Sequence, residues 1–243
     1  MRLKTSWAIV VCVIAVLPAT SFGQENSKFG LGVGFGVSSL GYRFDGAVRV
    51  TEQSNFRGAF NFLNYNKDTS RNGIDYAAKL GLRSLQFTYE QYIYKGFHVG
   101  GGVLAYNGNH ADGDAAVAAG QTFSLGNARY FSGATNPIHG TARVDLGHAA
   151  PIVVLGFGNP IPRSTRRIGF YVDGGVAFQA APRSTLALSG LACGVSPTVG
   201  CVNAATDPTV QANVLAEQSQ INDDLNLLKY YPLLSFGITW KIK

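Results

Sequence analysis

The chain has 243 residues, of which only 14% are charged and 30 are glycine, and its formal net charge is +6. Typical soluble domains carry about 25% charged residues and about 7% glycine. The mean hydropathy of +0.09 excludes a multi-span helical membrane protein, because each span needs about 20 consecutive apolar residues. Scarce charge and abundant glycine also argue against a disordered chain or a coiled coil.

The N-terminus has the layout of an export signal. Arg2 and Lys4 precede an apolar run, Trp7–Leu17, that is too short to span a bilayer as a helix. Small residues follow the run, and signal peptidase prefers small residues before the bond that it cuts. The sequence therefore predicts export through the Sec pathway and cleavage between Gly23 and Gln24.

Cleavage would leave residues 24–243 as a single domain and lower the net charge from +6 to +4. No cluster of Lys and Arg stands on one predicted face, so no nucleic-acid partner is expected. Cys12 would leave with the signal, which leaves Cys193 and Cys201. An oxidising compartment favours a disulfide between them. Two free thiols are the alternative, although the spacing is not that of a C-x-x-C redox pair.

Period-2 alternation dominates the rest of the chain and predicts β-strands with two unlike faces. Nearly every strand has bulky apolar residues on one face and Gly, Ala, Ser or charged residues on the other. The phase of the pattern changes near Ser84, as a β-bulge would cause. About eight strands are expected, with ten as an alternative, over residues 28–37, 42–50, 56–62, 75–90, 97–106, 150–158, 168–179 and 234–242.

The composition of the two faces distinguishes two kinds of β-protein. A soluble barrel or sandwich packs its bulky residues inward. In a transmembrane barrel the bulky face meets lipid, and small or charged residues fill the lumen. Gly30, Gly32, Gly34 and Gly36 alternate along one face, and such a strand would be weak as a solvent-exposed face of a soluble barrel. The sequence thus predicts an all-β fold, a single antiparallel transmembrane β-barrel.

The connections between the predicted strands are unequal in length. Short turns alternate with two long segments, 107–149 and 180–231, which are expected as outer loops because barrels have short periplasmic turns. Asp207 is a helix N-cap before Pro208, so an amphipathic helix is predicted near 208–229. The side of the membrane that this helix occupies stays open, since an extra strand at 185–191 would reverse it.

The alternation over residues 28–242 and the last strand resemble the bacterial outer-membrane β-barrel family, in particular small barrels similar to the outer-membrane protein A transmembrane domain. In that family the last strand acts as an assembly signal, which Ser235, Gly237, Trp240 and Ile242 match here. Ile242 stands where an aromatic residue is more usual. The resemblance implies the outer membrane of a Gram-negative cell, contact with outer-membrane lipid, and recognition by the barrel-assembly machinery.

The predicted lumen face carries ten charged side chains that together suggest a closed barrel of structural or interaction type. An eight-stranded lumen is just filled by side chains, and an extracellular ligand would then bind at loops 107–149 and 180–231. The alternative is a porin-like passive-diffusion pore for small solutes, where the excess of basic residues would favour anions. The ten residues are Arg43, Asp45, Arg49, Arg57, Asp75, Lys79, Arg83, Glu90, Asp173 and Lys241.

Catalytic and metal chemistry have little support in the sequence. The four histidines, His98, His110, His139 and His148, match no motif of a lipid-modifying barrel enzyme, which is the least favoured alternative. The segment 107–114 is rich in Asn and Asp, but it lacks EF-hand spacing and has the composition of any exposed turn. No catalytic residue, metal site or cofactor is predicted, and the chain is not expected to be an enzyme.

Overall fold

Eight strands close into an antiparallel barrel in this computed structural model, which describes residues 30–162 and 167–242. The expected cleavage site at Gly23–Gln24 lies outside the described residues. β1 pairs with β15 as well as with β2, and β5 pairs with both β4 and β10, so the ring has no open edge. The barrel strands are β1 (Leu31–Ser38), β2 (Gly41–Thr51), β3 (Ser54–Arg71), β4 (Ile74–Tyr94), β5 (Phe97–Asn107), β10 (Ala150–Gly158), β11 (Ile168–Phe178) and β15 (Tyr230–Lys241). The predicted single antiparallel barrel of eight strands is confirmed.

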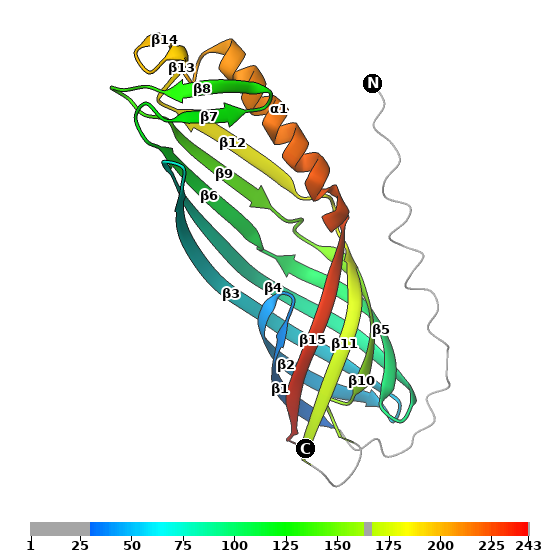
Figure 1. Ribbon diagram of the computed structural model, residues 1–243. Helices are drawn as coiled ribbons and strands as arrows, with labels where there is room; N and C mark the ends of the chain where they lie inside the picture. Colours follow the sequence, from blue (N-terminus) through cyan, green and yellow to red (C-terminus); the bar gives the residue numbers. More distant parts are fainter. Residues whose placement is uncertain (1–29, 163–166, 243) are drawn as a thin grey trace, which may run out of the picture.

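β3 and β4 run far beyond the barrel, and the long segments build an outer domain beside them (Figure 1). Three strands extend the sheet from β4: β6 (His110–Val117), β9 (His139–Asp145) and β12 (Arg183–Ser189). A four-stranded sheet lies at the far end: β7 (Thr122–Leu125), β8 (Ala128–Ser132), β13 (Leu191–Ser196) and β14 (Val199–Asn203). The segments expected as loops are therefore ordered structure.

The outer domain also contains α1 (Pro208–Leu225) and a 3₁₀-helix, η1 (Asn226–Lys229), which leads into β15. The Asp207 carboxylate accepts hydrogen bonds from the backbone N–H groups of Thr209 and Val210, both at 3.0 Å, so it caps the helix as predicted. An extra strand does form, as β12, but it pairs with β9, and α1 stays on the side of the long connections. No helix among the described residues is long and apolar enough to cross a membrane.

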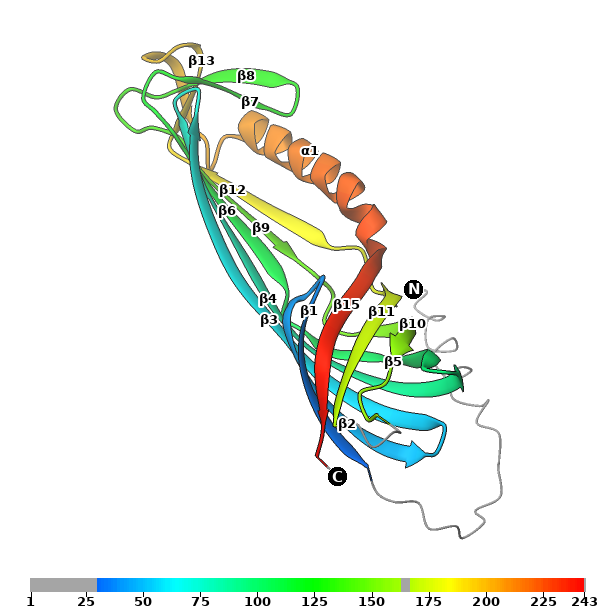
Figure 2. The ribbon, with the colours of Figure 1, turned by 60° about the horizontal axis from the view of Figure 1, so that its bottom comes forward.

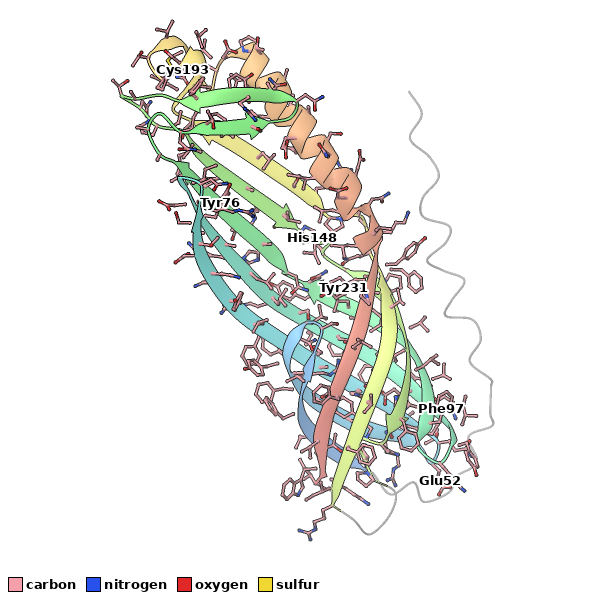
Figure 3. All side chains as sticks on the ribbon, viewed as in Figure 1. Glu52, Tyr76, Phe97, His148, Cys193 and Tyr231 are labelled. Atoms are coloured by element: carbon pink, nitrogen blue, oxygen red, sulfur yellow. A yellow bond between two sulfur atoms is a disulfide. The ribbon has the colours of Figure 1, made fainter. Side chains whose placement is uncertain are left out.

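The two ends of the barrel differ. The chain enters β1 and leaves β15 at one end, the turn end, where β2–β3 and β4–β5 join through short turns; Figure 3 labels Glu52 and Phe97 there. The outer domain stands on the other end, the loop end. It has its own apolar core, which includes Val117, Ile138 and Val210.

Large apolar side chains cover the outside of the barrel. Phe35 is 51% exposed, Phe44 50% and Phe236 61%. The inward positions of the same strands are polar or small, which is the reverse of a soluble barrel. The apolar belt therefore faces lipid.

The expected β-bulge near Ser84 is wrong for β4. Inward and outward residues alternate without a break from Leu82 to Tyr92, and the register with β3 is continuous. The irregularity lies on β5, where Ala105 is an extra residue opposite Leu85 and Gln86. The polarity of the two faces changes near Ser84 because the strand leaves the lipid belt there.

That change of polarity corrects three assignments to the lumen. Leu82 points inward, so odd-numbered residues of β4 point outward. This outward face carries Asp75, Lys79 and Arg83, and all three are exposed. Above the apolar belt the outward face meets water, so charged residues are suited to it. They are surface residues and not part of the lumen.

Candidate functional site: a sealed barrel lumen

Arg57 on β3 lies at the centre of a buried charge cluster in the lumen. Its Nη1 is 2.8 Å from Oδ2 of Asp173 and 3.7 Å from Oδ1 of Asp45, and its Nη2 contacts Oε1 of Glu90. None of these four side chains is more than 7% exposed. Buried charges are costly unless they are paired, and one guanidinium here pairs with carboxylates from three strands, β2, β4 and β11.

Arg43 on β2 extends the cluster toward the loop end. Its Nε donates to Oδ1 of Asp45 at 2.8 Å, and its Nη1 donates to Oε1 of Gln86 at 3.1 Å. The Tyr171 hydroxyl donates to the other oxygen of Asp45. The Tyr171 ring also lies 4.6 Å from Cζ of Arg57, a distance at which a cation and an aromatic face attract each other.

His98 and Tyr92 complete the cluster on its other side. His98 Nε2 is 3.2 Å from Oδ1 of Asp173, and the imidazole is fully buried. The Tyr92 hydroxyl donates to Oε2 of Glu90 at 3.1 Å and accepts from Nδ2 of Asn55 at 3.2 Å. Each carboxylate is thus contacted through both of its oxygens, although the contact between His98 and Oδ1 of Asp173 lacks hydrogen-bond geometry.

Glu90, His98 and Asp173 offer ligand atoms within 4.8 Å of one another, a set that could hold a metal ion. The Arg57 guanidinium, however, contacts both carboxylates of this set. It supplies the positive charge that a metal would bring. The arrangement therefore suits an ion-pair network better than a metal centre.

Lumen glycines make room for the large side chains of the cluster. A Cβ on Gly36 would lie 2.9 Å from the Tyr171 hydroxyl, and a Cβ on Gly237 would lie 2.7 Å from it. Gly36 and Gly237 face each other across β1 and β15. A Cβ on Gly156 would meet His98 at 2.6 Å. The glycine-rich inner face is the shape complement of Tyr171 and His98.

An apolar layer closes the lumen toward the loop end. Leu40, in the tight turn between β1 and β2, packs with a buried cluster from four other strands: Leu104, Ala150, Ile152, Ala177 and Leu233. Gly41, next to Leu40, has φ +102°, a conformation that glycine adopts without strain. The cavity between this layer and Arg43 has a volume of about 10 Å³, which is room for roughly one water molecule.

The connection after β10 closes the turn end. Ile161 in this connection is completely buried. Oδ1 of Asn159 accepts hydrogen bonds from the Ile161 N–H at 2.9 Å and from Nδ2 of Asn55 at 3.0 Å. A Cβ on Gly32 would lie 2.4 Å from the Pro160 carbonyl oxygen, so β1 accommodates the connection only with glycine there.

Five of the ten predicted lumen residues meet in the cluster: Arg43, Asp45, Arg57, Glu90 and Asp173. Arg49 and Lys241 lie half-buried on the inward face near the turn end, and no ion pair joins either of them to another described residue. Asp75, Lys79 and Arg83 lie outside.

The prediction missed three buried partners of the cluster, His98, Tyr92 and Tyr171. The spacing of these residues from predicted inward residues could have identified them. Tyr171 is two residues from Asp173 and Tyr92 two residues from Glu90, so each shares an inward face with a predicted lumen acid. His98 precedes the inward Gly100 by two residues in the same way.

The remaining predicted positions lie away from the cluster, except Ser235 and Gly237, and Gly237 lies against Tyr171. Cys193 and Cys201 form the predicted disulfide across β13 and β14, at the outer tip of the molecule (Figure 3). In the last strand Ser235 points inward, and its hydroxyl donates to Asp173 at 3.4 Å. Trp240 and Ile242 are exposed to the lipid side.

The other histidines lie apart from one another in the outer domain. His110 Nε2 is 3.6 Å from Asp112, and His139 and His148 are exposed. Within residues 30–162 and 167–242, no hydrogen bond joins a serine hydroxyl to an imidazole. The Asn-rich segment has structural contacts: Oδ1 of Asn109 accepts from the Arg83 N–H at 2.7 Å.

Comparison with known proteins places the fold. No protein-family model matches the chain, and no curated protein matches it. Among solved structures, the chain is similar to Acinetobacter baumannii CarO, with a TM-score of 0.56 and 19% identity over 87% of this chain and 97% of that one. It is also similar to CarO2 of the same organism, with a TM-score of 0.57 and 17% identity over 87% of this chain and 98% of that one. At these identities the similarity shows a shared β-barrel fold.

Proposed function

We propose that the chain is an anchor protein of a Gram-negative outer membrane, whose barrel is sealed and holds the ordered outer domain at the cell surface for interaction. The observation that carries this proposal is the buried cluster around Arg57. It occupies the middle of the lumen, where a conducting barrel would have water.

The orientation follows from the two ends of the barrel. The expected export signal at the N-terminus leads the chain out of the cytoplasm through the Sec pathway, and a short-turn end faces the periplasm in barrels of this kind. The outer domain then lies outside the cell. The last strand, with Trp240 and Ile242 on its lipid face, would be the segment that the barrel-assembly machinery recognises.

A narrow pore is the alternative, and the lumen argues against it. Barrels of eight strands are filled by side chains, whereas channels form in porins of 16–18 strands. A solute would have to displace the apolar layer at Leu40, the cluster at Arg57 and the buried Ile161 in turn. Each barrier consists of side chains that are almost fully buried.

Conductance in planar bilayers tests the proposal. We expect the folded protein to give no channels, while a general porin inserted in parallel gives stable steps. A difference in gel mobility between the boiled and the unheated sample establishes that the protein was folded. Stable steps from the folded protein whose ion selectivity changes with Asp173→Asn would establish the pore instead.

Enzymatic activity is not part of the proposed function, because no serine hydroxyl bonds to an imidazole in the described part of the chain. Incubation of the folded protein with mixed phospholipid vesicles should release no fatty acid above a protein-free control. Hydrolysis that is lost on His148→Ala would instead assign the outer domain a catalytic role.

A further inference from the structure

The sheet of the outer domain has two edges, and only one of them is covered. β12 is one edge, and α1 lies along it: Oδ1 of Asn222 accepts from the Ser184 N–H at 2.7 Å, and Oε1 of Gln218 accepts from the Leu186 N–H at 3.2 Å. The other edge is the outer half of β3, residues 63–71. β2 pairs with β3 only as far as Phe62, and nothing described lies beside the strand beyond it (Figures 1 and 2). We call residues 63–71 the free β3 edge.

The register of β3 shows which backbone groups the free β3 edge presents. The Tyr92 N–H donates to the Gln53 carbonyl across the β3–β4 ladder. In an antiparallel ladder every second residue bonds to the same neighbour, so odd-numbered residues of β3 bond to β4. Even-numbered residues therefore direct one N–H and one C=O each to the open side. These residues are Asn64, Asn66, Asp68 and Ser70, all of them exposed.

The side chains beside this edge have a definite chemistry on each face. One face of this edge continues the barrel lumen and carries Leu63, Tyr65, Lys67 and Arg71. Tyr65 is 55% exposed. Across the ladder Tyr65 faces Leu80, so the face is apolar near the barrel and basic farther out. The opposite face is polar, with the side chains of the even-numbered residues.

We propose that the free β3 edge is a docking site for an extended strand of a partner protein outside the cell, added antiparallel to β3. Open backbone groups of a strand pair with another strand. Directly opposed side chains of such a pair share a face, so the partner has an apolar residue opposite Tyr65 and acidic residues opposite Lys67 and Arg71.

A second copy of this chain fits the free β3 edge less well. Two copies in one membrane both direct β3 away from that membrane, so their edges would meet as parallel strands. Parallel pairing is slightly less stable per residue than antiparallel pairing. The charge of the edge favours a different, acidic partner.

The probe is a labelled peptide, Glu-Thr-Val-Thr-Glu-Thr-Val-Thr-Val, whose order sets Glu against Arg71 and Lys67 and Val against Tyr65. We expect it to bind the full-length folded protein, and fluorescence anisotropy of the label measures this binding. The same peptide N-methylated at its threonines has lost the N–H groups that face β3 and should bind at least about ten-fold more weakly. Equal binding of the two peptides, or no binding up to about 1 mM, would overturn the proposal.

Variants of the edge test the same contacts from the protein side. Asn66→Pro removes an edge N–H without touching the β3–β4 bonds and should weaken binding about ten-fold, whereas Asn66→Ala keeps the N–H and should bind as the wild type does. Lys67→Glu should weaken binding about two- to five-fold, and a peptide with Lys in place of Glu should restore it. The mobility of unheated samples verifies that each variant is folded.

Two outcomes would contradict this assignment. If Asn66→Pro and Asn66→Ala bind the probe alike, the backbone edge is not the site. If the wild type sediments as a dimer that Asn66→Pro dissociates, and the probe does not compete, the edge joins two copies of this chain and not a partner strand.

Discussion

At the scale of single residues, the lumen depends on Arg57. Its guanidinium contacts carboxylates from β2, β4 and β11, so it joins opposite walls of the barrel. A buried ion pair contributes little beyond what a good apolar packing would give, but breaking one leaves an uncompensated charge. The cost of losing Arg57 is therefore mainly the cost of three carboxylates left without a counter-charge.

We expect Arg57→Ala to lower the free energy of unfolding by about 3–5 kcal/mol. Denaturant unfolding in detergent can be followed by the fluorescence of Trp240, because the other tryptophan, Trp7, lies in the expected signal segment. Arg143→Ala is the matched control. Arg143 is 3.0 Å from Asp112 on the exposed outer sheet, and Asp145 raises the pKa of its guanidinium through a hydrogen bond. Solvent screens such surface pairs, so they contribute little to stability. Equal midpoints for the two variants would contradict the central role of Arg57.

Glycine at position 156 provides a second test at this scale. Gly156→Ala places a methyl group against His98 and Asp173, and overpacking of this kind costs about 1–3 kcal/mol. Gly101→Ala, on β5, is the control, because no atom lies within 4 Å of a Cβ there. Thermal unfolding of the two variants should differ in midpoint. If Gly156→Ala melts with the wild type, the cluster is looser than its contacts indicate.

Sequence reasoning identified the acids and arginines of the lumen but not their arrangement. Asp45, Glu90 and Asp173 could be assigned to an inward face from alternation alone. The surroundings of Asp75, Lys79 and Arg83 could not be assigned in this way. The outward face of β4 meets lipid between Arg83 and the turn end, and it meets water from Arg83 toward the outer domain. Alternation reports which residues share a face, and it does not report what medium that face meets.

At the scale of elements, α1 acts as a cover for a sheet edge. Only Val210 and Val214 of the helix are buried, so apolar burial alone holds it weakly. Its amide side chains add specific anchors: Asn222 and Gln218 accept from the β12 backbone. Uncovered edges are prone to pair with other chains, and this helix prevents that for β12.

Asn222→Ala should release the Ser184 N–H and speed hydrogen–deuterium exchange across β12. The loss of one such hydrogen bond amounts to about 0.5–1.5 kcal/mol, which corresponds to roughly two- to twelve-fold faster exchange. Gln220→Ala is the control, since Gln220 is exposed on the same helix. Mass spectrometry of the peptide that covers residues 183–189 measures the effect. Exchange that is equal in the two variants would show that α1 does not protect the edge.

At the scale of the whole molecule, two apolar cores are separate. One lies in the barrel, around Leu40 and Ile152, and the other lies in the outer domain, around Val117 and Val210. The number of barrel strands followed from the sequence because lipid imposes a strict alternation on them. The structure of the outer domain could not be predicted from the sequence, since its strands are short or lie in water. Its sheets also pair segments that are distant in sequence, such as β9 with β12.

Separate cores predict separate responses to loss of the disulfide. The Cys193–Cys201 bond closes a short ring, for which chain entropy gives about 2–3 kcal/mol, and that contribution belongs to the outer core through its buried neighbour Ala192. We expect Cys193→Ser combined with Cys201→Ser to make residues 191–203 sensitive to added protease. The barrel should keep its unheated gel mobility in the same sample, because none of its lumen contacts reaches this hairpin. Loss of that mobility in the double variant would mean that the two parts fold as one cooperative unit, and the barrel would then not serve as an independent anchor.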